Sequence, residues 1–176
     1  MLDEHDGPVG PEDLFGAWRL VAYTAQDDQG AGLHHPLGDD ADGFLMYTPD
    51  GYMSVQMMRR NRVDYDQPDI SGGTADQNAD AAAGYLAYCG PFGIDPETGT
   101  VHHLIEVSLL PNWLRTVQLR QPSLQKNRLT MHARYSVGGA LIDSVLRWSR
   151  AARLDPYTAT PSTWIGAEGT SDCWAT

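Results

Sequence analysis

The chain of 176 residues is 41% hydrophobic and 20% charged, and its formal net charge at pH 7 is -11. A single domain of this size can bury about 70% of its unfolded surface, and no apolar run approaches the roughly 18 residues of a membrane-spanning helix. The 23 acidic against 12 basic residues would repel a phosphate backbone, so neither nucleic acid nor a membrane is an expected partner.

Short segments of alternating apolar and polar residues, separated by Gly, Pro, Asn and Asp, run through the chain and are typical of an antiparallel meander. Eight strands are predicted, over residues 18–25, 43–48, 52–59, 89–94, 100–110, 113–121, 128–137 and 141–150. The second and third are joined at Pro49-Asp50-Gly51, where proline presets φ and glycine accepts the positive φ that closes a tight turn.

Two segments lack the alternation of a strand. Residues 60–80 are polar and rich in glycine, and the alanine-rich residues 79–88 are predicted to form a short helix. Because a long loop of this kind often covers a binding site, we expect a mobile lid here. Residues 151–176 are expected to be a C-terminal extension of a single domain, 1–176, whose core is about residues 12–150.

Eight consecutive antiparallel strands must hide the two edges of their sheet. Closing the sheet into an up-and-down barrel removes both edges, and a barrel of eight strands can hold one small ligand. The predicted fold class is therefore all-β, an eight-stranded antiparallel up-and-down β-barrel. A sandwich of two sheets has the same strand count and is the alternative.

The segment 101–113 carries two imidazoles and a carboxylate. Successive side chains of a strand point to opposite faces, so His102 and Glu106 share one face and His103 lies on the other. Imidazole titrates near neutral pH and can transfer a proton without a large pKa shift. His102, His103 and Glu106 are the candidate catalytic residues, with Arg120 as the partner of an inward-facing Glu106. The alternatives are a packing role for the imidazoles and a surface position for Glu106.

Polar residues within otherwise apolar strands are candidates for ligand contacts. An enzyme needs a few polar groups against the reacting atoms, whereas a carrier lines its cavity mainly with apolar side chains. Trp113 is expected at the rim of the barrel, where it can stack on a ligand. Tyr88, on the predicted helix 79–88, can close the opening or anchor that helix. The candidate ligand-binding residues are Tyr47, Gln56, Tyr88, Trp113, Gln118, Arg120 and Tyr135.

Other chemistries have no basis in the sequence. The G-x-S-x-G, P-loop and G-x-G-x-x-G motifs are absent, so serine-hydrolase and nucleotide chemistry are not expected, nor is a cofactor. Cys89 and Cys173 are too few for a disulfide framework and too far apart for a zinc motif. A metal site built from His34, His35 and the imidazoles at 102–103 would require a loop to meet a strand, and no metal is expected.

The first predicted strand opens with Gly16-Ala17-Trp18, which resembles the G-x-W signature of lipocalins. In that family the tryptophan closes one end of the barrel, and the resemblance implies that an arginine from the last strand, here Arg147, lies across it. The motifs LMYTPDGYMS (45–54), YLAYCG (85–90) and the stretch from His-His to Pro-Asn-Trp (102–113) follow in the order typical of the bacterial and fungal lipocalin-like domain family. Its stand-alone barrels often occur in natural-product biosynthesis.

This resemblance covers about residues 12–150 and implies a lipocalin-like barrel with a short lid helix. Barrels of this kind serve both as binders and as enzymes, so the fold alone does not decide the activity. The leading hypothesis is a cofactor-independent cyclase or isomerase that acts on a hydrophobic polyketide or terpenoid intermediate, because folding a flexible chain into a reactive pose removes part of the entropic barrier.

The alternatives are a non-catalytic carrier of small molecules and an interaction module whose barrel is filled by side chains. The expected partner is a hydrophobic small molecule, and a homodimer is compatible with the sequence. The first six residues are rich in Asp and Glu, whereas a secretion signal begins basic and continues apolar, so we expect a cytoplasmic protein.

Overall fold

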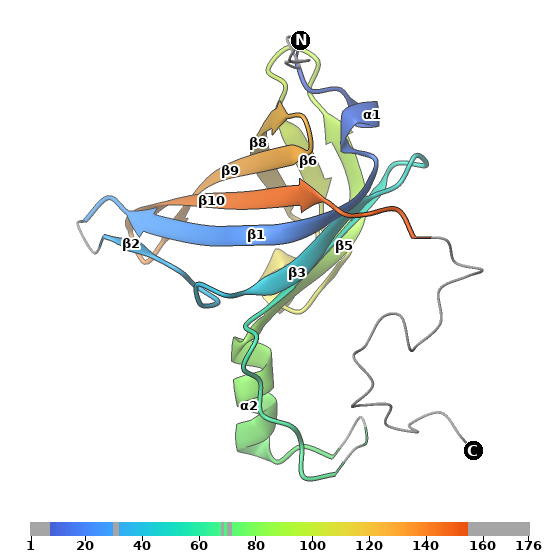
Figure 1. The fold of residues 1–176 in the computed structure, drawn as a ribbon. Helices are drawn as coiled ribbons and strands as arrows, with labels where there is room; N and C mark the ends of the chain where they lie inside the picture. The colour runs from blue at the N-terminus through green and yellow to red at the C-terminus, as the bar shows by residue number, and fades with distance from the viewer. Residues whose placement is uncertain (1–7, 30–31, 68, 70–71, 155–176) are drawn as a thin grey trace.

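The computed structural model describes residues 8–29, 32–67, 69 and 72–154 (Figure 1). Its strands are β1 (Gly16–Asp27), β2 (Leu33–His34), β3 (Asp42–Tyr47), β4 (Tyr52–Met58), β5 (Tyr85–Ile94), β6 (Val101–Leu104), β7 (Val107–Ser108), β8 (Val117–Gln125), β9 (Arg128–Val137) and β10 (Ala140–Arg150). Its helices are α1 (Pro11–Leu14), α2 (Ala75–Ala83) and the 3-10 turn η1 (Pro111–Trp113). No helix in this part of the chain is long and apolar enough to cross a membrane.

Eight of the strands close into an antiparallel barrel. Hydrogen-bonded neighbours follow the order β10-β9-β8-β6-β5-β4-β3-β1, and β1 pairs with β10 to complete the ring. The short strands β2 and β7 add to β1 and β5. The predicted eight-stranded lipocalin-like barrel is therefore confirmed, and the two-sheet sandwich is excluded, because the ring of eight strands leaves no free sheet edge.

The alternation of apolar and polar residues located most of the strands. The predicted strand 128–137 coincides with β9, and the turn 49–51 joins β3 to β4, with Gly51 at a φ of 91°. β8 begins at Val117 instead of residue 113, because the preceding residues form the 3-10 turn η1. The period of two thus places a strand better than it places the strand's ends.

The predicted strand 100–110 is interrupted by a β-bulge. Phe92 pairs with His103 in β6, whereas Cys89 pairs with Val107 in β7, so the register shifts by one residue between these pairs. Every side chain after the bulge is turned to the opposite face. Val107 is consequently exposed, although a regular strand would have placed it on the inner face with His103.

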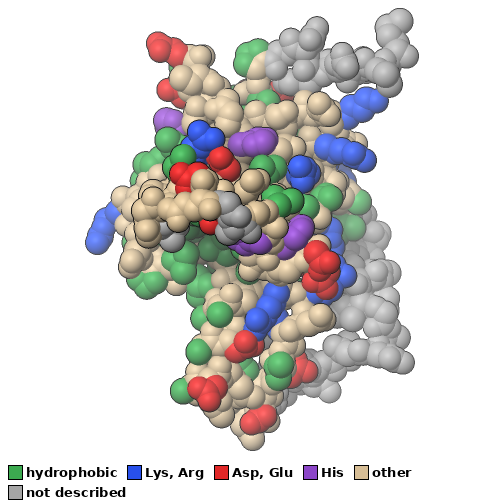
Figure 2. All heavy atoms as spheres, turned by 90° about the vertical axis from the view of Figure 1, so that its left-hand side faces the viewer, with side chains coloured by type: hydrophobic (Ala, Val, Ile, Leu, Met, Phe, Trp, Pro, Cys, Tyr) green, Lys and Arg blue, Asp and Glu red, His purple; other side chains and the backbone are tan. Residues whose placement is uncertain are grey.

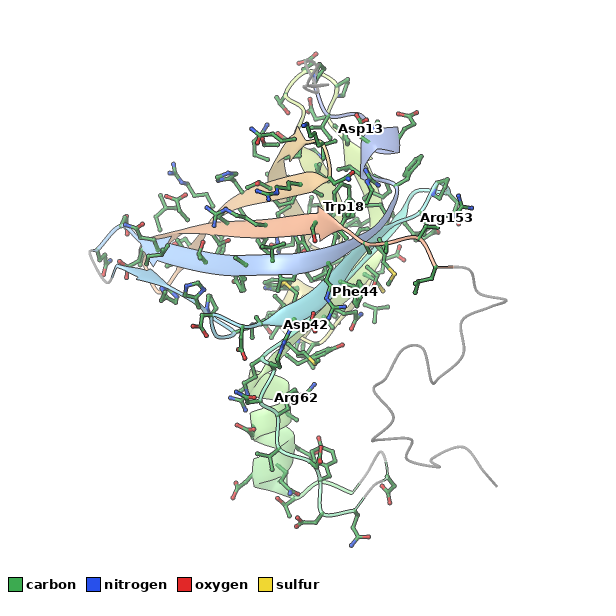
Figure 3. The ribbon with its side chains drawn as sticks, in the orientation of Figure 1. Asp13, Trp18, Asp42, Phe44, Arg62 and Arg153 are labelled. Carbon is green, nitrogen blue, oxygen red and sulfur yellow. The ribbon has the colours of Figure 1, made fainter. Side chains whose placement is uncertain are left out.

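Trp18 seals one end of the barrel, beside α1 (Figure 3). The guanidinium of Arg150 lies 4.0 Å from the centre of the Trp18 ring and donates hydrogen bonds to the carbonyl oxygens of Phe15 at 2.8 Å and Asp13 at 2.7 Å. An arginine of the last strand does cover the tryptophan, but the prediction of Arg147 was wrong. Arg150 is the residue opposite Trp18 in the β1–β10 register, and Arg147 points outward.

Helix α2 lies at the other, open end of the barrel, between β4 and β5. It begins at Thr74, whose hydroxyl accepts from the Gln77 N–H while the Gln77 side chain accepts from the Thr74 N–H. It ends at Gly84, so the predicted helix 79–88 was placed too late. None of its residues is buried, and it projects away from the barrel (Figure 1). Because the helix buries none of its residues, the expected lid does not cover the opening here.

Candidate ligand-binding site

The inner wall of the barrel carries a connected row of polar side chains, which we call the polar seam. It is assembled from inward-facing positions on six strands, β1, β3, β5, β6, β8 and β9, and therefore exists only once the barrel is closed. Its members are Tyr23, Tyr47, Tyr88, His103, Arg120 and Tyr135. Buried apolar residues of these strands and of β4 complete the wall and include Leu45, Val55, Met57, Val101 and Met131.

His103 is the most enclosed member of the seam, with 1% of its surface exposed. Its Nε2 lies 2.7 Å from the Tyr47 hydroxyl, and its Nδ1 lies 3.4 Å from the Tyr88 hydroxyl. Burial, followed by the positive charge of Arg120, holds the pKa of His103 well below its usual range. The ring is therefore neutral near pH 7, with one nitrogen donating a hydrogen bond and the other accepting one.

Arg120 continues the seam on β8, and only 8% of its surface is exposed. Its Nη1 donates to the carbonyl oxygen of Leu119 at 2.7 Å, and its Nη2 donates to the hydroxyl of Tyr88 at 3.4 Å. Within the described residues, no carboxylate forms an ion pair with this guanidinium. Arg120 thus brings a positive charge into the barrel without a negative partner.

Two tyrosines of the seam keep their protons. Burial raises the pKa of Tyr47 and that of Tyr23 well above the usual range. The neighbouring Tyr135, which also hydrogen-bonds Tyr23, adds to the second shift. The positive charge of Arg120 lowers both pKa values, but this effect is smaller than the rise caused by burial. Tyr23 and Tyr47 therefore offer neutral hydroxyl groups, which can donate or accept a hydrogen bond.

Aromatic rings pack beside the seam and form part of the barrel wall. The ring centre of Phe92 is 4.7 Å from that of Tyr47, and Trp113 of η1 stands edge-on to Tyr88 at 5.4 Å. η1 lies in the connection between β7 and β8 at the open end, the position expected for Trp113. Figure 2 looks toward this end, where hydrophobic and histidine side chains gather among scattered charged ones. The surroundings of the seam suit an aromatic ligand.

The barrel brings most of the predicted site residues together. Tyr47, Tyr88, His103, Arg120 and Tyr135 are members of the polar seam, and Trp113 packs against it. Gln118 is half-buried on β8 and is paired with His103 of β6, so it shares the inner face.

Two of the three predicted catalytic residues lie outside this group. Glu106 is exposed, because it lies on the same face of the segment as His102, opposite to the inward-facing His103, and the expected pair with Arg120 does not form. His102 alternates with His103 along β6 and therefore faces outward, half-buried. Of the proposed imidazole and carboxylate groups, only His103 reaches the interior.

Gln56, a predicted ligand contact, is also on the outer face. Its neighbours Val55 and Met57 are buried in the core, so Gln56 points away from it. Its amide nitrogen donates to the hydroxyl of Ser54 at 3.3 Å, and its carbonyl oxygen accepts from the hydroxyl of Tyr85. Gln56 thus links β4 to β5 on the outside.

Tyr23 was missed from the sequence. Trp18 and Leu20 face inward, and a regular alternation would have turned Tyr23 outward. The pairing of β1 with β10 instead shifts between Leu20 and Ala22, which rotates the following residues by one position. No residue type marks this irregularity, so neither the period nor the composition of β1 could have revealed it.

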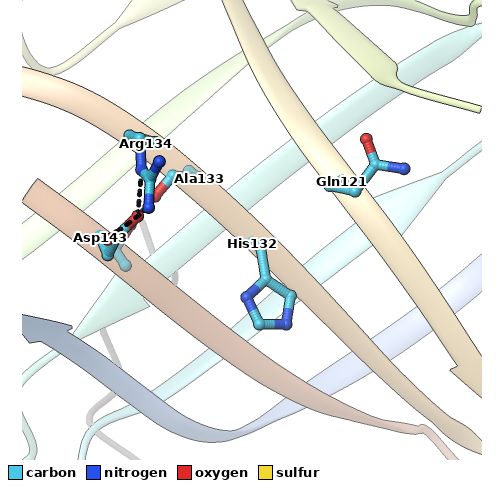
Figure 4. Close-up of a pocket in the computed structure, with 6 residues that line it drawn as sticks. Gln121, His132, Ala133, Arg134 and Asp143 are labelled. Atoms are coloured by element: carbon cyan, nitrogen blue, oxygen red, sulfur yellow. Dashed lines mark hydrogen bonds and ion pairs between the residues drawn. The ribbon is translucent and has the colours of Figure 1, made fainter. Parts of the chain in front are cut away.

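A hollow lies on the outside of the barrel, over β8, β9 and β10 (Figure 4). It has a volume of about 480 Å³, and Arg134 forms a bidentate ion pair with Asp143 at its edge. Across the described residues, no three His, Cys, Asp or Glu side chains come close enough to share a metal ion.

A closed eight-stranded barrel sealed by a tryptophan of its first strand, with a polar seam inside, defines a lipocalin-type protein. Residues 15–151 match the lipocalin-like domain family, and the chain belongs to it. A relative from Aspergillus oryzae, the 4'-hydroxy-3'-methoxypropiophenone carrier protein ppsC, is 30% identical over 110 residues, which cover 58% of this chain and 99% of the relative. The structure titled "The Siderocalin Ex-FABP functions through dual ligand specificities" is 10% identical, with a TM-score of 0.31 over 82% of this chain and 74% of that one.

Proposed function

We propose that the protein is a carrier that binds a small, largely apolar aromatic ketone or phenol inside its barrel. The observation that carries this proposal is the polar seam, in which Tyr47, His103, Tyr88 and Arg120 are linked within an otherwise apolar wall. Ligand sites are typically lined by apolar and aromatic groups, with a few polar groups that fix the orientation of the ligand. The hydroxyl and imidazole groups here can bond to a carbonyl or phenol oxygen.

The named cargo of the Aspergillus relative has the chemistry that this wall favours. That compound combines an aromatic ring with a ketone and a phenol group, each of which can take part in hydrogen bonds. The ring would pack against Trp113 and Phe92, and the oxygens would lie against the seam. The relative thereby supports a ligand of this chemical class for the present chain.

Binding can be tested by titrating 4'-hydroxy-3'-methoxypropiophenone into the protein and following heat or tryptophan fluorescence. We expect saturable binding at one site, and the Tyr88→Phe variant should bind about tenfold more weakly, because one buried hydrogen bond contributes about 1 kcal/mol or somewhat more. Tyr52→Phe is the matched control, since Tyr52 is 52% exposed on the outer face. Absence of saturation, or equal affinity of the Tyr88→Phe variant, would overturn the proposal.

A second candidate function is a cyclase or isomerase of a hydrophobic polyketide or terpenoid intermediate. It is favoured by His103, whose two ring nitrogens face the hydroxyls of Tyr47 and Tyr88. A neutral imidazole between two hydroxyls can accept a proton on one side and release one on the other. Conversion of a candidate intermediate into an isomer of equal mass, lost in His103→Gln, would establish catalysis, whereas unaltered retention of that compound would leave the carrier.

A further inference from the structure

The charge of Arg120 is unbalanced inside the barrel. Other arginines have carboxylate partners on the surface, such as Arg19 with Asp42 and Arg134 with Asp143. Arg120 is more than nine-tenths buried, and of its five N–H donors one contacts a backbone carbonyl and another a hydroxyl. Burial of a charge without a partner is strongly unfavourable, so a group of opposite sign is expected at this position when the protein is in its working state.

The side chains that face Arg120 do not supply that negative charge. They are Tyr23 from β1, Tyr47 from β3, Tyr88 from β5 and His103 from β6. Burial keeps Tyr23 and Tyr47 protonated and His103 neutral, as their pKa shifts indicate. The last member of the seam is Tyr135 on β9, whose side chain hydrogen-bonds to Tyr23. No carboxylate belongs to this set.

We propose that Arg120 binds an oxyanion of the ligand, so that the protein carries its cargo in the ionised form. This inference rests on the proposed function and specifies the class of ligand further. The oxyanion is an ionised phenol, an enolate or a carboxylate attached to an apolar aromatic body. Arg120 provides the positive charge, and the Tyr88 hydroxyl beside it provides a second hydrogen-bond donor. Hydrogen bonds between charged groups are about twice as strong as those between neutral groups.

The chemistry of aryl ketones makes such an anion accessible near neutral pH. A carbonyl group conjugated to a phenol spreads the negative charge of the phenolate and lowers the pKa of the phenol. Methylation of the phenol oxygen removes the ionisable proton and leaves the ring and ketone nearly unchanged. A phenol and its methyl ether therefore form a matched pair of probes that differ in their ability to carry charge.

The test compares para-hydroxypropiophenone with para-methoxypropiophenone by calorimetric titration between about pH 6 and 9. His103, Tyr23 and Tyr47 hold their protonation states across this range because of their pKa shifts. We expect the affinity for the phenol to rise as the phenol ionises, until it exceeds that for the ether by at least about tenfold. The affinity for the ether should stay constant. The carboxylate para-propionylbenzoate, charged throughout, shows whether a carboxylate can replace the phenolate.

The variant Arg120→Gln should bind the phenol and the ether equally and lose the pH dependence, whereas Arg120→Lys should keep a preference for the anion. Should Arg120→Gln fail to fold, the pH profile of the wild-type protein and the Arg120→Lys variant still decide. Tight binding of the ether with no preference for the phenolate would overturn this inference and leave the carrier function standing. Absence of binding by all three compounds would overturn both. Binding of para-propionylbenzoate alone would assign the oxyanion to a carboxylate.

Discussion

Acidification should destabilise the folded protein through His103. In the unfolded chain an imidazole has a pKa of about 6.5. In the barrel, burial and the nearby Arg120 lower this pKa well below that value. Below about pH 6.5 the unfolded chain therefore binds a proton that the folded protein excludes, and stability falls with pH. Above that pH the imidazole is neutral in both states, and its contribution to stability is fully present.

The magnitude follows from the unfolded-state pKa alone, as long as folded His103 stays neutral. At pH 7.5 about one-tenth of unfolded imidazole is protonated, and at pH 5.5 about ten-elevenths is. Linkage converts this difference into a loss of about 1.4 kcal/mol in the free energy of unfolding between the two pH values. The variant His103→Gln lacks the titrating group and should lack this loss, whatever its stability at pH 7.5.

The assay is urea unfolding of the wild-type protein and the His103→Gln variant at both pH values, at constant ionic strength. Carboxylates titrate in both proteins, so they cancel when the pH-induced changes are subtracted. His35→Gln is the control for an exposed imidazole and should retain the wild-type pH dependence. An equal loss of stability in the wild-type protein and His103→Gln would refute the neutral, buried state of His103, on which the electrostatic description of the seam depends.

Three further predictions concern the frame of the barrel. Gly90→Ala should lower the free energy of unfolding, measured in urea, by about 3 kcal/mol, because a Cβ at this position would lie 2.0 Å from the carbonyl oxygen of Leu104. Gly93→Ala is the control and should be nearly neutral, because its Cβ would meet nothing within 4 Å. Arg150→Gln should cost about 2 kcal/mol in the same assay through two carbonyl bonds and a ring contact, and Arg147→Gln, on the outer face, should change little. Thr74→Ala removes the hydroxyl that caps α2 and should lower the local stability of this helix by about 1 kcal/mol. Amide exchange in α2 should therefore become faster, while the urea midpoint of the whole protein stays unchanged.

The strands and their closure could be predicted from sequence because they depend on a repeating signal. Residues 128–137 alternate throughout, and the Pro49-Asp50-Gly51 turn requires no tertiary information, so both were located directly. Helix α2 carries a comparable local signal in Thr74 and Gln77, a capping box that marks its start. The alanine content alone pointed to a later start and obscured that signal.

The site was predicted only where alternation is unbroken. Tyr47 and Arg120 lie in regular stretches of their strands and face inward. Tyr88 was placed in the predicted helix 79–88, but it lies in β5 and faces inward from there. Glu106 was considered as an inward-facing partner of Arg120, although alternation from the inward-facing His103 places it outside. Tyr23 follows a one-residue irregularity in the pairing of β1 with β10 and was missed for that reason. Such a bulge depends on how one strand meets its neighbour, which the sequence of that strand does not encode by itself.

The alternation of side chains along residues 102–106 explains why the interior holds a charge without a counterion. His103 and Ile105 face inward, so Leu104 and Glu106 between and after them face outward. Glu106 therefore stays outside the barrel, and no described carboxylate pairs with Arg120. A protein that had to be stable without ligand would gain by pairing or replacing this arginine. Its retention beside donors such as Tyr88 is physically consistent with a site completed by an anionic cargo, and the matched phenol and ether probes separate that explanation from a purely structural role.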